Sequence, residues 1–238
     1  MPIHAKIAAR ASRGVRSKPK GPGEVPAAKM ELILRHAAQI FSEKGYEGAS
    51  IRDLSRASGV SLAGLYYYIE SKQKLLYLIQ QYTFQTIVDR LEKRLKGVRT
   101  PEERLRIFVH NHLDYFLKHR VEMKVLSHED DALEGAFRRD VMELKRKYYG
   151  IALGMIEELK KSGAARRVHP RVAVLSLFGM MNWVYTWHRP ELDPQADALA
   201  EEMAGLFMRG VLSREGTPAA KPHPFVRSGG KMAARAIG

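Results

Sequence analysis

The chain of 238 residues contains no cysteine. This absence excludes disulfide bridges, thiolate metal sites and cysteine nucleophiles, and it fits a reducing cytoplasm. Long apolar runs are absent as well, since the longest stretch without a charged residue, Val172–Trp187, includes Ser, Gly, Asn and Thr. A membrane-spanning helix needs about 20 predominantly apolar residues. We therefore expect no membrane span, and the N-terminus lacks the apolar core of a signal peptide.

The alternation of apolar and polar residues that is typical of β-strands is also missing. Apolar residues recur instead at helical spacing, and the breaks between these stretches contain Gly, Pro or clustered charges. The pattern predicts an all-α protein with about nine helices. The segments predicted as helices are 28–44, 51–58, 62–68, 71–96, 100–118, 121–127, 132–161, 168–188 and 194–212.

The formal net charge is +14, and much of the excess lies at the two ends of the chain. Residues 1–28 and 213–238 are both rich in Lys and Arg, with a single Glu in each segment. Their Gly, Pro, Ala and Ser content without apolar periodicity predicts disordered tails. The tails are either solubilising segments or, at the N-terminus, a basic arm that adds sequence-independent affinity for nucleic acid.

The segment Ser50–Leu76 has the pattern of two short helices joined by a glycine turn and followed by a third helix. Ser50, Ser61 and Ser71 stand where N-cap residues are expected. Gly59 tolerates the left-handed conformation that a sharp turn requires. This arrangement is a helix-turn-helix, so double-stranded DNA is the first partner to consider.

The spacing of apolar residues predicts which sides of the two short helices are buried. The predicted inward residues are Ile51, Leu54 and Ala57 in the first helix and Leu62, Leu65 and Ile69 in the second. The remaining positions of the second helix face outward, namely Ala63, Gly64, Tyr67 and Tyr68, with Tyr66 near the boundary. Small residues allow close approach to base edges, while tyrosine hydroxyls can contact phosphates.

The motif G-V-S-x-x-x-L-Y-Y-x-I-x-S-K-x-x-L-L, within Met30–Leu76, resembles the DNA-binding signature of the tetracycline-repressor (TetR) family. The resemblance implies a three-helix DNA-binding domain at 29–76 and a ligand-binding and dimerisation domain at 77–212. It also implies a repressor in the bacterial cytoplasm, associated with the nucleoid, that leaves a palindromic operator when an effector binds. The residues predicted to contact DNA are Ser50, Arg52, Ser61, Leu62, Ala63, Gly64, Tyr66, Tyr67, Tyr68 and Lys72.

Several of these positions depart from the family pattern. Many members have Lys, Gly and Thr or Ser at the positions of Leu62, Ala63 and Gly64, and His at that of Tyr68. This chain therefore lacks polar base-reading groups at several usual places. We expect its operator to be read partly by shape and apolar contact.

The last two long helices carry broad apolar faces that one protomer is not expected to cover. By the resemblance, this pair forms a four-helix bundle with its two-fold mate, giving a homodimer. An ordinary core within one monomer is the alternative reading, and a charged substitution of Phe207 is expected to separate the two. The predicted interface residues are Ala173, Leu177, Met180, Met181, Val184, Trp187, Leu199, Met203, Leu206, Phe207 and Val211.

The segment 178–190 is similar to an N-W-x-x-x-W-x-R-P-like pattern of TetR-type regulators of fatty-acid or sterol-ring degradation, which respond to acyl-coenzyme A (acyl-CoA) thioesters. In this reading Asn182 orients the ligand, and His188 and Arg189 meet an anionic head group. Apolar residues line a cavity, or alternatively pack as ordinary core, and a multidrug-type sensor is the other ligand class within the family. The predicted lining residues are Phe108, Tyr115, Met155, Phe178, Met181 and Trp183.

Signatures of catalysis are absent from the sequence, which has no glycine-rich phosphate loop, G-x-S-x-G or H-E-x-x-H. His110 and His112 lie on different sides of one helix, so they do not form a metal pair. The acidic segment 128–131 is either a cation site or, more simply, a solvated loop that caps the next helix. A helical-bundle enzyme with a DNA-binding appendage is the alternative function, but its paired Glu and Glu-x-x-His pattern is missing. We expect no catalytic residue, metal or cofactor.

Overall fold

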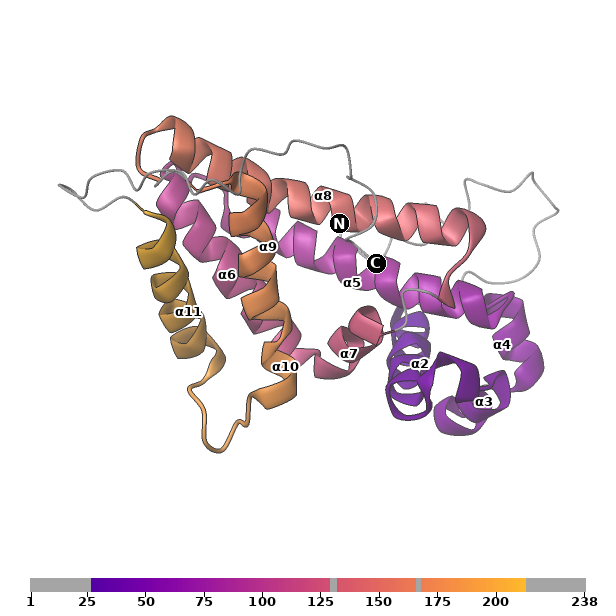
Figure 1. Ribbon diagram of the computed structural model, residues 1–238. Helices are drawn as coiled ribbons and strands as arrows, with labels where there is room; N and C mark the ends of the chain where they lie inside the picture. The colour runs from indigo at the N-terminus through magenta and orange to yellow at the C-terminus, as the bar shows by residue number, and fades with distance from the viewer. Residues whose placement is uncertain (1–26, 129–131, 166–167, 213–238) are drawn as a thin grey trace. The chain divides into compact units, whose positions relative to one another are not determined.

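The computed structural model describes residues 27–128, 132–165 and 168–212. Within these ranges the chain is helical, with one isolated β-bridge between Ala165 and Leu212 (Figure 1). The helices are α2 (Ala27–Gly48), α3 (Ile51–Ser58), α4 (Leu62–Tyr68), α5 (Lys72–Arg94), α6 (Pro101–Lys118), α7 (Arg120–His128), α8 (Gly135–Lys161), α9 (Pro170–Asn182), α10 (Val184–Trp187) and α11 (Ala196–Val211).

The all-α prediction is confirmed, and each of the nine predicted helices has a counterpart. The helix predicted at 168–188 is divided at Trp183, which is both the C-cap of α9 and the N-cap of α10. The predicted tails at 1–28 and 213–238 lie almost entirely outside the described residues, as does most of the acidic segment 128–131. Every described helix is too short or too polar to cross a lipid bilayer.

The described residues form two compact units. The first contains residues up to Thr83 together with Lys124–Val141, and the second contains Phe84–Met123 and the residues from Met142 onward. In the first unit α2 packs on α3 and α3 packs on α4. In the second, α6 packs on α9, α10 and α11. The two long helices α5 and α8 contribute to both units.

The helix-turn-helix belongs to the first unit and has a small apolar core. Phe41 of α2, Leu54 of α3, and Leu65 and Ile69 at α4 are all buried. Regular helical geometry in α2 ends at Gly45, whose φ of 70° is in the left-handed region that favours glycine. This end agrees with the helix predicted to stop at residue 44.

Two residues predicted to face this core are exposed instead. Ala57 lies in the last turn of α3, next to the Gly59 turn, where no element covers it. Leu62 is the first residue of α4, so only a loop precedes it, and it too is exposed. The spacing of apolar residues predicts burial reliably in the middle of a helix. At a helix end it is less reliable, because the end extends beyond the neighbouring helices that would cover it. The exposure of Leu62 agrees with the outward position that the family resemblance implied.

The first turns of α5 pack on the start of α8 within the first unit. The ring of Tyr77 stacks on that of Phe137, with centroids 4.8 Å apart. The ammonium group of Lys74 lies 4.7 Å from the Tyr77 ring centroid, within the range of a cation–π contact. On the α7 side, Lys124 Nζ donates to the Ser42 carbonyl oxygen of α2 at 2.6 Å. These contacts explain why residues 124–141 join the unit that contains the helix-turn-helix.

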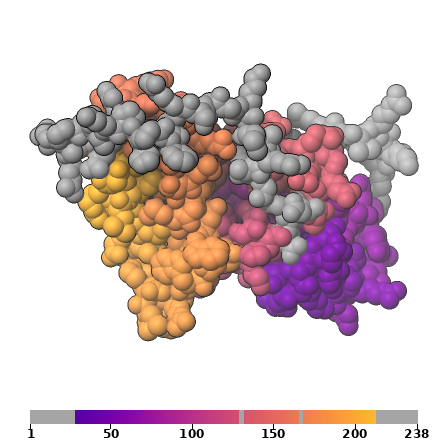
Figure 2. Space-filling model, viewed as in Figure 1, coloured from indigo at the N-terminus to yellow at the C-terminus, as the bar shows by residue number. Residues whose placement is uncertain are grey.

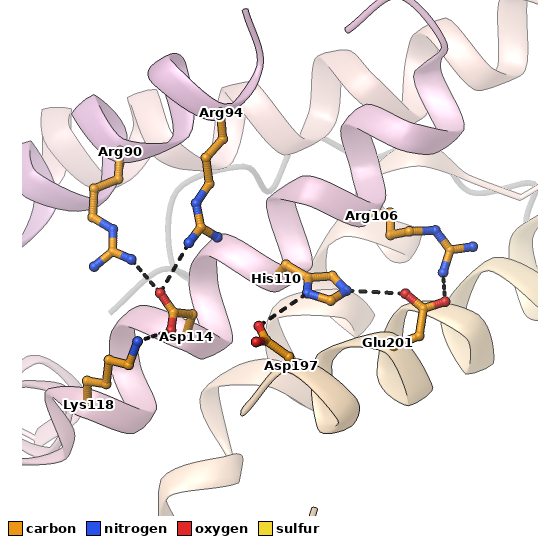
Figure 3. A network of polar contacts seen from close by, with 8 residues as sticks. All are labelled: Arg90, Arg94, Arg106, His110, Asp114, Lys118, Asp197 and Glu201. Atoms are coloured by element: carbon orange, nitrogen blue, oxygen red, sulfur yellow. Dashed lines mark hydrogen bonds and ion pairs between the residues drawn. The ribbon is translucent and has the colours of Figure 1, made fainter. Parts of the chain in front are cut away.

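Ion pairs fix α6 on both sides within the second unit (Figure 3). Towards α5, the buried carboxylate of Asp114 accepts hydrogen bonds from Arg90, Arg94 and Lys118. Towards α11, Glu201 pairs with Arg106 and also lies 3.2 Å from His110 Nε2. The Asp114 cluster is the more shielded of the two, because the Asp114 side chain is only 9% exposed whereas that of Glu201 is 56% exposed.

Most of the predicted dimer residues on α9 and α11 face the core of their own protomer, as in the alternative reading, whereas Met180, Trp187 and Leu206 are not buried. The reason for the burial is that α6 packs on both helices and covers their main apolar stripe. A charged residue at Phe207 would therefore damage the protomer core rather than test an interface. A homodimer through these two helices stays a prediction. The predicted interface residues that are buried in one protomer are Ala173, Leu177, Met181, Val184, Leu199, Met203, Phe207 and Val211.

Other apolar side chains on the same helices are exposed. Val172 and Leu175 of α9, Trp183 at its C-cap and Leu206 of α11 are all exposed. The surfaces of α9, α10 and α11 adjoin one another on the face shown in Figure 2. We call these four residues the outer apolar strip.

Candidate DNA interface and effector site

The two helices of the helix-turn-helix are capped by serines, as predicted. Ser50 and Asp53 form a reciprocal capping box, in which the Asp53 N–H donates to Ser50 Oγ and the Ser50 N–H donates to Asp53 Oδ2. Ser61 Oγ accepts from the Gly64 N–H at 3.1 Å. Between them Gly59 has a φ of 68°, which confirms the predicted glycine turn.

The carboxylate of Asp53 also organises the positive charges around α3. Lys44 Nζ and an Arg56 guanidinium nitrogen lie 2.9 and 2.7 Å from Asp53 Oδ1. The hydrogen bonds from Lys44 and Ser50 hold the pKa of Asp53 well below its ordinary value. Asp53 is therefore ionised at physiological pH, and its negative charge partly neutralises the positive charges of Lys44 and Arg56. Arg52, the predicted phosphate contact on this helix, is exposed.

The predicted base-reading side of α4 is exposed. Ala63 is on the surface, and Tyr66 and Tyr67 are 55% and 59% exposed. Gly64 is close to the preceding turn, because a Cβ at this position would lie 3.2 Å from Val60 Cγ1. A small residue is needed here for α4 to begin so near the turn. The result is a helix that presents small residues first and tyrosine side chains after them.

Tyr68 is less exposed than its two neighbours. Its ring meets that of Tyr67 edge to face at 5.0 Å, and the Lys29 ammonium lies 5.7 Å from its centroid. The cation–π contact brings a positive charge from α2 next to the end of α4. Sequence reasoning did not identify Lys29 as part of this surface.

Lys72 has a structural role that the sequence did not indicate. Its ammonium donates to the carbonyl oxygens of Tyr46 and Ala49 at 2.8 and 3.3 Å. It also lies 4.2 Å from the centroid of the Tyr46 ring. Lys72 therefore caps the C-terminal end of α2, where carbonyl groups lack helical partners. A phosphate contact from the same ammonium remains a prediction.

We expect Lys72→Ala to lower the free energy of unfolding by about 1–2 kcal/mol, because charge-assisted hydrogen bonds and a cation–π contact are lost together. Urea denaturation followed by circular dichroism measures this change. Lys93→Ala, which removes an exposed lysine near the end of α5, is the control and should change stability by less than about 0.5 kcal/mol. Equal stabilities of the two variants would contradict the capping role.

The residues predicted to line an effector cavity occupy different environments in the second unit. Phe178 is partly buried, while Asn182, Trp183 and Arg189 are exposed. The members that are buried in the protomer are Phe108, Tyr115, Met155, Met181 and His188. The predicted lining residues are thus divided between the protein core and its surface.

Phe108 and Phe178 belong to one aromatic cluster, with ring centroids 5.9 Å apart. Tyr148 of α8 completes it, stacking on Phe108 at 5.0 Å and lying 5.7 Å from Phe178. His112 lies beside them, with Nδ1 3.2 Å from the Tyr148 hydroxyl oxygen. Sequence reasoning missed both His112 and Tyr148. The four-residue spacing of Phe108, His112 and Phe116 on α6 was the available signal.

Tyr115 is joined to this cluster through Phe116, whose ring it meets edge to face at 5.3 Å. It stacks on His119 at 4.3 Å and has the Arg90 guanidinium 5.6 Å from its centroid. His188 and Arg189 begin the turn between α10 and α11. His188 Nε2 lies 3.0 Å from the Pro194 carbonyl oxygen, and the Arg189 N–H donates to the Asp193 carboxylate. Of the predicted head-group pair, only Arg189 offers an exposed charge.

Comparison with known proteins assigns the family. Residues 33–77 match the family model described as bacterial regulatory proteins, tetR family. Residues 98–211 match the model described as tetracyclin repressor-like, C-terminal domain. The transcriptional repressor NicS of Pseudomonas putida is 27% identical over 134 residues, which are 56% of this chain and 62% of NicS.

Two solved structures are similar over nearly their whole length. AibR, in complex with isovaleryl coenzyme A and operator DNA, is 29% identical, with a TM-score of 0.68 over 75% of this chain and 97% of AibR. PfmR from Thermus thermophilus is 30% identical, with a TM-score of 0.68 over 74% of this chain and 94% of PfmR. On these matches, the chain belongs to the TetR family of bacterial transcriptional regulators.

Proposed function

We propose that this protein is a cytoplasmic repressor that reads a palindromic operator with α3 and α4. The exposed face of α4 carries this proposal, since it presents Ala63, Tyr66 and Tyr67 directly after a capped helix start. The small residue allows close approach to base edges, and tyrosine hydroxyls suit phosphate or sugar contacts. The exposed Leu62 can meet the methyl group of thymine.

Fluorescence anisotropy with DNA from upstream of the protein's own coding region tests this proposal. We expect binding that exceeds binding to a scrambled duplex by about 1,000-fold or more at fixed salt. Tyr67→Ala should weaken specific binding by about tenfold, whereas Tyr149→Ala, a partly exposed tyrosine of the second unit, should leave it unchanged. Equal affinity for both duplexes in the wild-type protein would reduce the interaction to a general attraction of a basic chain for DNA.

The proposed active form is a homodimer that uses the outer apolar strip, Val172, Leu175, Trp183 and Leu206. Exposed apolar residues gathered on adjoining helices are typical of an interaction surface. A two-fold interface is self-complementary, so the same strip on two copies would meet. Two copies are needed to place one α4 in each half-site of a palindrome, roughly one DNA turn apart.

The proposed effector is an apolar or amphipathic molecule, and acyl-CoA is the specific candidate. The likeness to AibR, a structure solved with isovaleryl coenzyme A, supports this choice. The aromatic cluster of the second unit supplies suitable apolar surroundings for an acyl group. Release from DNA requires that the effector bind the DNA-free conformation more tightly than the DNA-bound one.

A further inference from the structure

The second unit contains a buried histidine with an unpaired nitrogen. His112 has only 2% of its surface exposed, and its Nε2 forms no hydrogen bond of normal geometry among the described residues, although the Asn182 side chain is close enough to act on the imidazole. A buried polar atom without a partner costs about 1–3 kcal/mol. Such groups are few in native proteins, and each calls for a water, an ion or a ligand that completes its bonding. His112 is therefore a candidate for direct contact with an effector.

Tyr148 determines which nitrogen of His112 carries the proton. Burial raises the pKa of Tyr148 well above its usual value, so its hydroxyl group is protonated. When this hydroxyl donates to His112 Nδ1, at 3.2 Å, the imidazole proton must lie on Nε2. The opposite tautomer would leave the phenolic proton without a partner. The favoured arrangement thus offers Nε2–H as a buried donor that lacks a well-aligned acceptor.

The charge of His112 restricts the chemistry of that acceptor. Burial lowers the pKa of His112 to about 3, although hydrogen bonding with the Asn182 side chain acts in the opposite direction. The imidazole is consequently neutral at physiological pH and does not attract an anion by charge. A neutral N–H donor suits a neutral acceptor such as a carbonyl oxygen.

The side chains around His112 restrict the polarity of the part of the ligand that lies next to the acceptor atom. The rings of Phe116 and Phe178 lie 4.6 and 6.0 Å from the imidazole centroid. A hydrogen bond is stronger in such a poorly polar environment, and the atoms next to the acceptor must themselves be apolar. Phe178 is only partly buried and Asn182 is exposed, so the cluster reaches the surface along α9.

We propose that His112 Nε2–H donates a hydrogen bond to a carbonyl oxygen of an apolar effector that lies against Phe116 and Phe178. Tyr148 is a positioning residue that fixes the donor tautomer. This inference rests on the proposed function, because it names the group by which the effector is recognised. A thioester and a ketone both supply such a carbonyl, and the experiment separates them.

Isothermal titration calorimetry of the full-length protein tests the carbonyl contact with two pairs of probes. The first pair is dodecanoyl-CoA and S-dodecyl-CoA, a thioether without the carbonyl. The second pair is a 3-ketosteroid and the steroid that lacks the ketone. We expect one carbonyl compound to bind more tightly than its partner, and His112→Phe to weaken that compound about tenfold while sparing the carbonyl-free partner. The pair that shows this pattern identifies the source of the carbonyl.

Tyr148→Phe provides a second variant in case His112→Phe does not fold. It should reduce the preference for the carbonyl probe and shift the His112 tautomer, which ¹⁵N nuclear magnetic resonance of labelled histidine reports without any ligand. A wild-type Nδ1–H tautomer, equal binding within both pairs, or no binding of either carbonyl compound would overturn the proposal. Operator affinity measured without ligand in the same samples reports separately on the proposed function, and neither variant should change it.

Discussion

Replacing Leu175 and Leu206 by glutamate is expected to convert the protein to monomers in sedimentation velocity. Both leucines are exposed in one protomer, so the substitutions spare the protomer core. In a two-fold interface each substitution occurs twice, and buried unpaired charges are strongly unfavourable. We expect the dimer dissociation constant to rise by about 1,000-fold or more. Operator binding should fall with it, because a monomer occupies only one half-site.

Leu192→Glu is the matched control for this prediction. Leu192 is 75% exposed and lies in the turn between α10 and α11, outside the outer apolar strip. The same chemical change at this position should leave a full dimer and unchanged operator affinity. A dimer that persists in the double variant Leu175→Glu, Leu206→Glu would show that the interface uses another surface.

Replacing Asp114 by asparagine is expected to cause the largest loss of stability among these substitutions. The carboxylate is the shared partner of Arg90, Arg94 and Lys118 (Figure 3), and without it three cations face one another. Removing the buried carboxylate from among three partly exposed cations costs about 2–4 kcal/mol, which is less than the loss for a fully buried ion pair. Urea denaturation at neutral pH measures the difference. Glu201→Gln, in the exposed neighbouring network, is the control and should cost less than about 1 kcal/mol.

The Asp114 contribution should also depend on pH in a defined direction. Burial raises the pKa of Asp114, but the hydrogen bond and charge of Lys118 and the charges of Arg90 and Arg94 outweigh it and leave the pKa lowered. The stabilisation is therefore complete above the unfolded value of about 3.9 and is lost as the pH falls through the lower folded value. The stability gap between wild type and Asp114→Asn should close as the pH falls below about 4. A gap that stays constant to lower pH would contradict the ionised cluster.

The sequence predicted the helix-turn-helix in detail because its signals are local. The bounds of α3 and α4, the caps at Ser50 and Ser61 and the turn at Gly59 all depend on residues within a few positions of one another. The interactions that were missed join distant residues. Lys72 caps a helix end 26 positions earlier, at Tyr46, and no short motif encodes that contact.

Most residues predicted for the dimer surface lie in the protomer core for a related reason. Apolar spacing shows that α9 and α11 each have a buried stripe, but it does not say which element covers the stripe. In the structure α6 covers it, and the exposed residues Leu175 and Leu206 lie on the outer side. Similarly, the position of His112 on an apolar face was readable from α6 alone, whereas its partner Tyr148 lies 36 positions away.

The break between α9 and α10 gives the protein an optical reporter of its own. The chain has two tryptophans, and both lie at the ends of α10, with Trp183 65% and Trp187 43% exposed. When tryptophan is excited selectively, all of the emission therefore comes from a single helical turn. Solvated indoles emit at long wavelength and are open to quenching by acrylamide. Any molecule that covers this turn, including the partner protomer of the proposed homodimer at Trp183, should shift the emission to the blue and protect it from the quencher, without an attached dye.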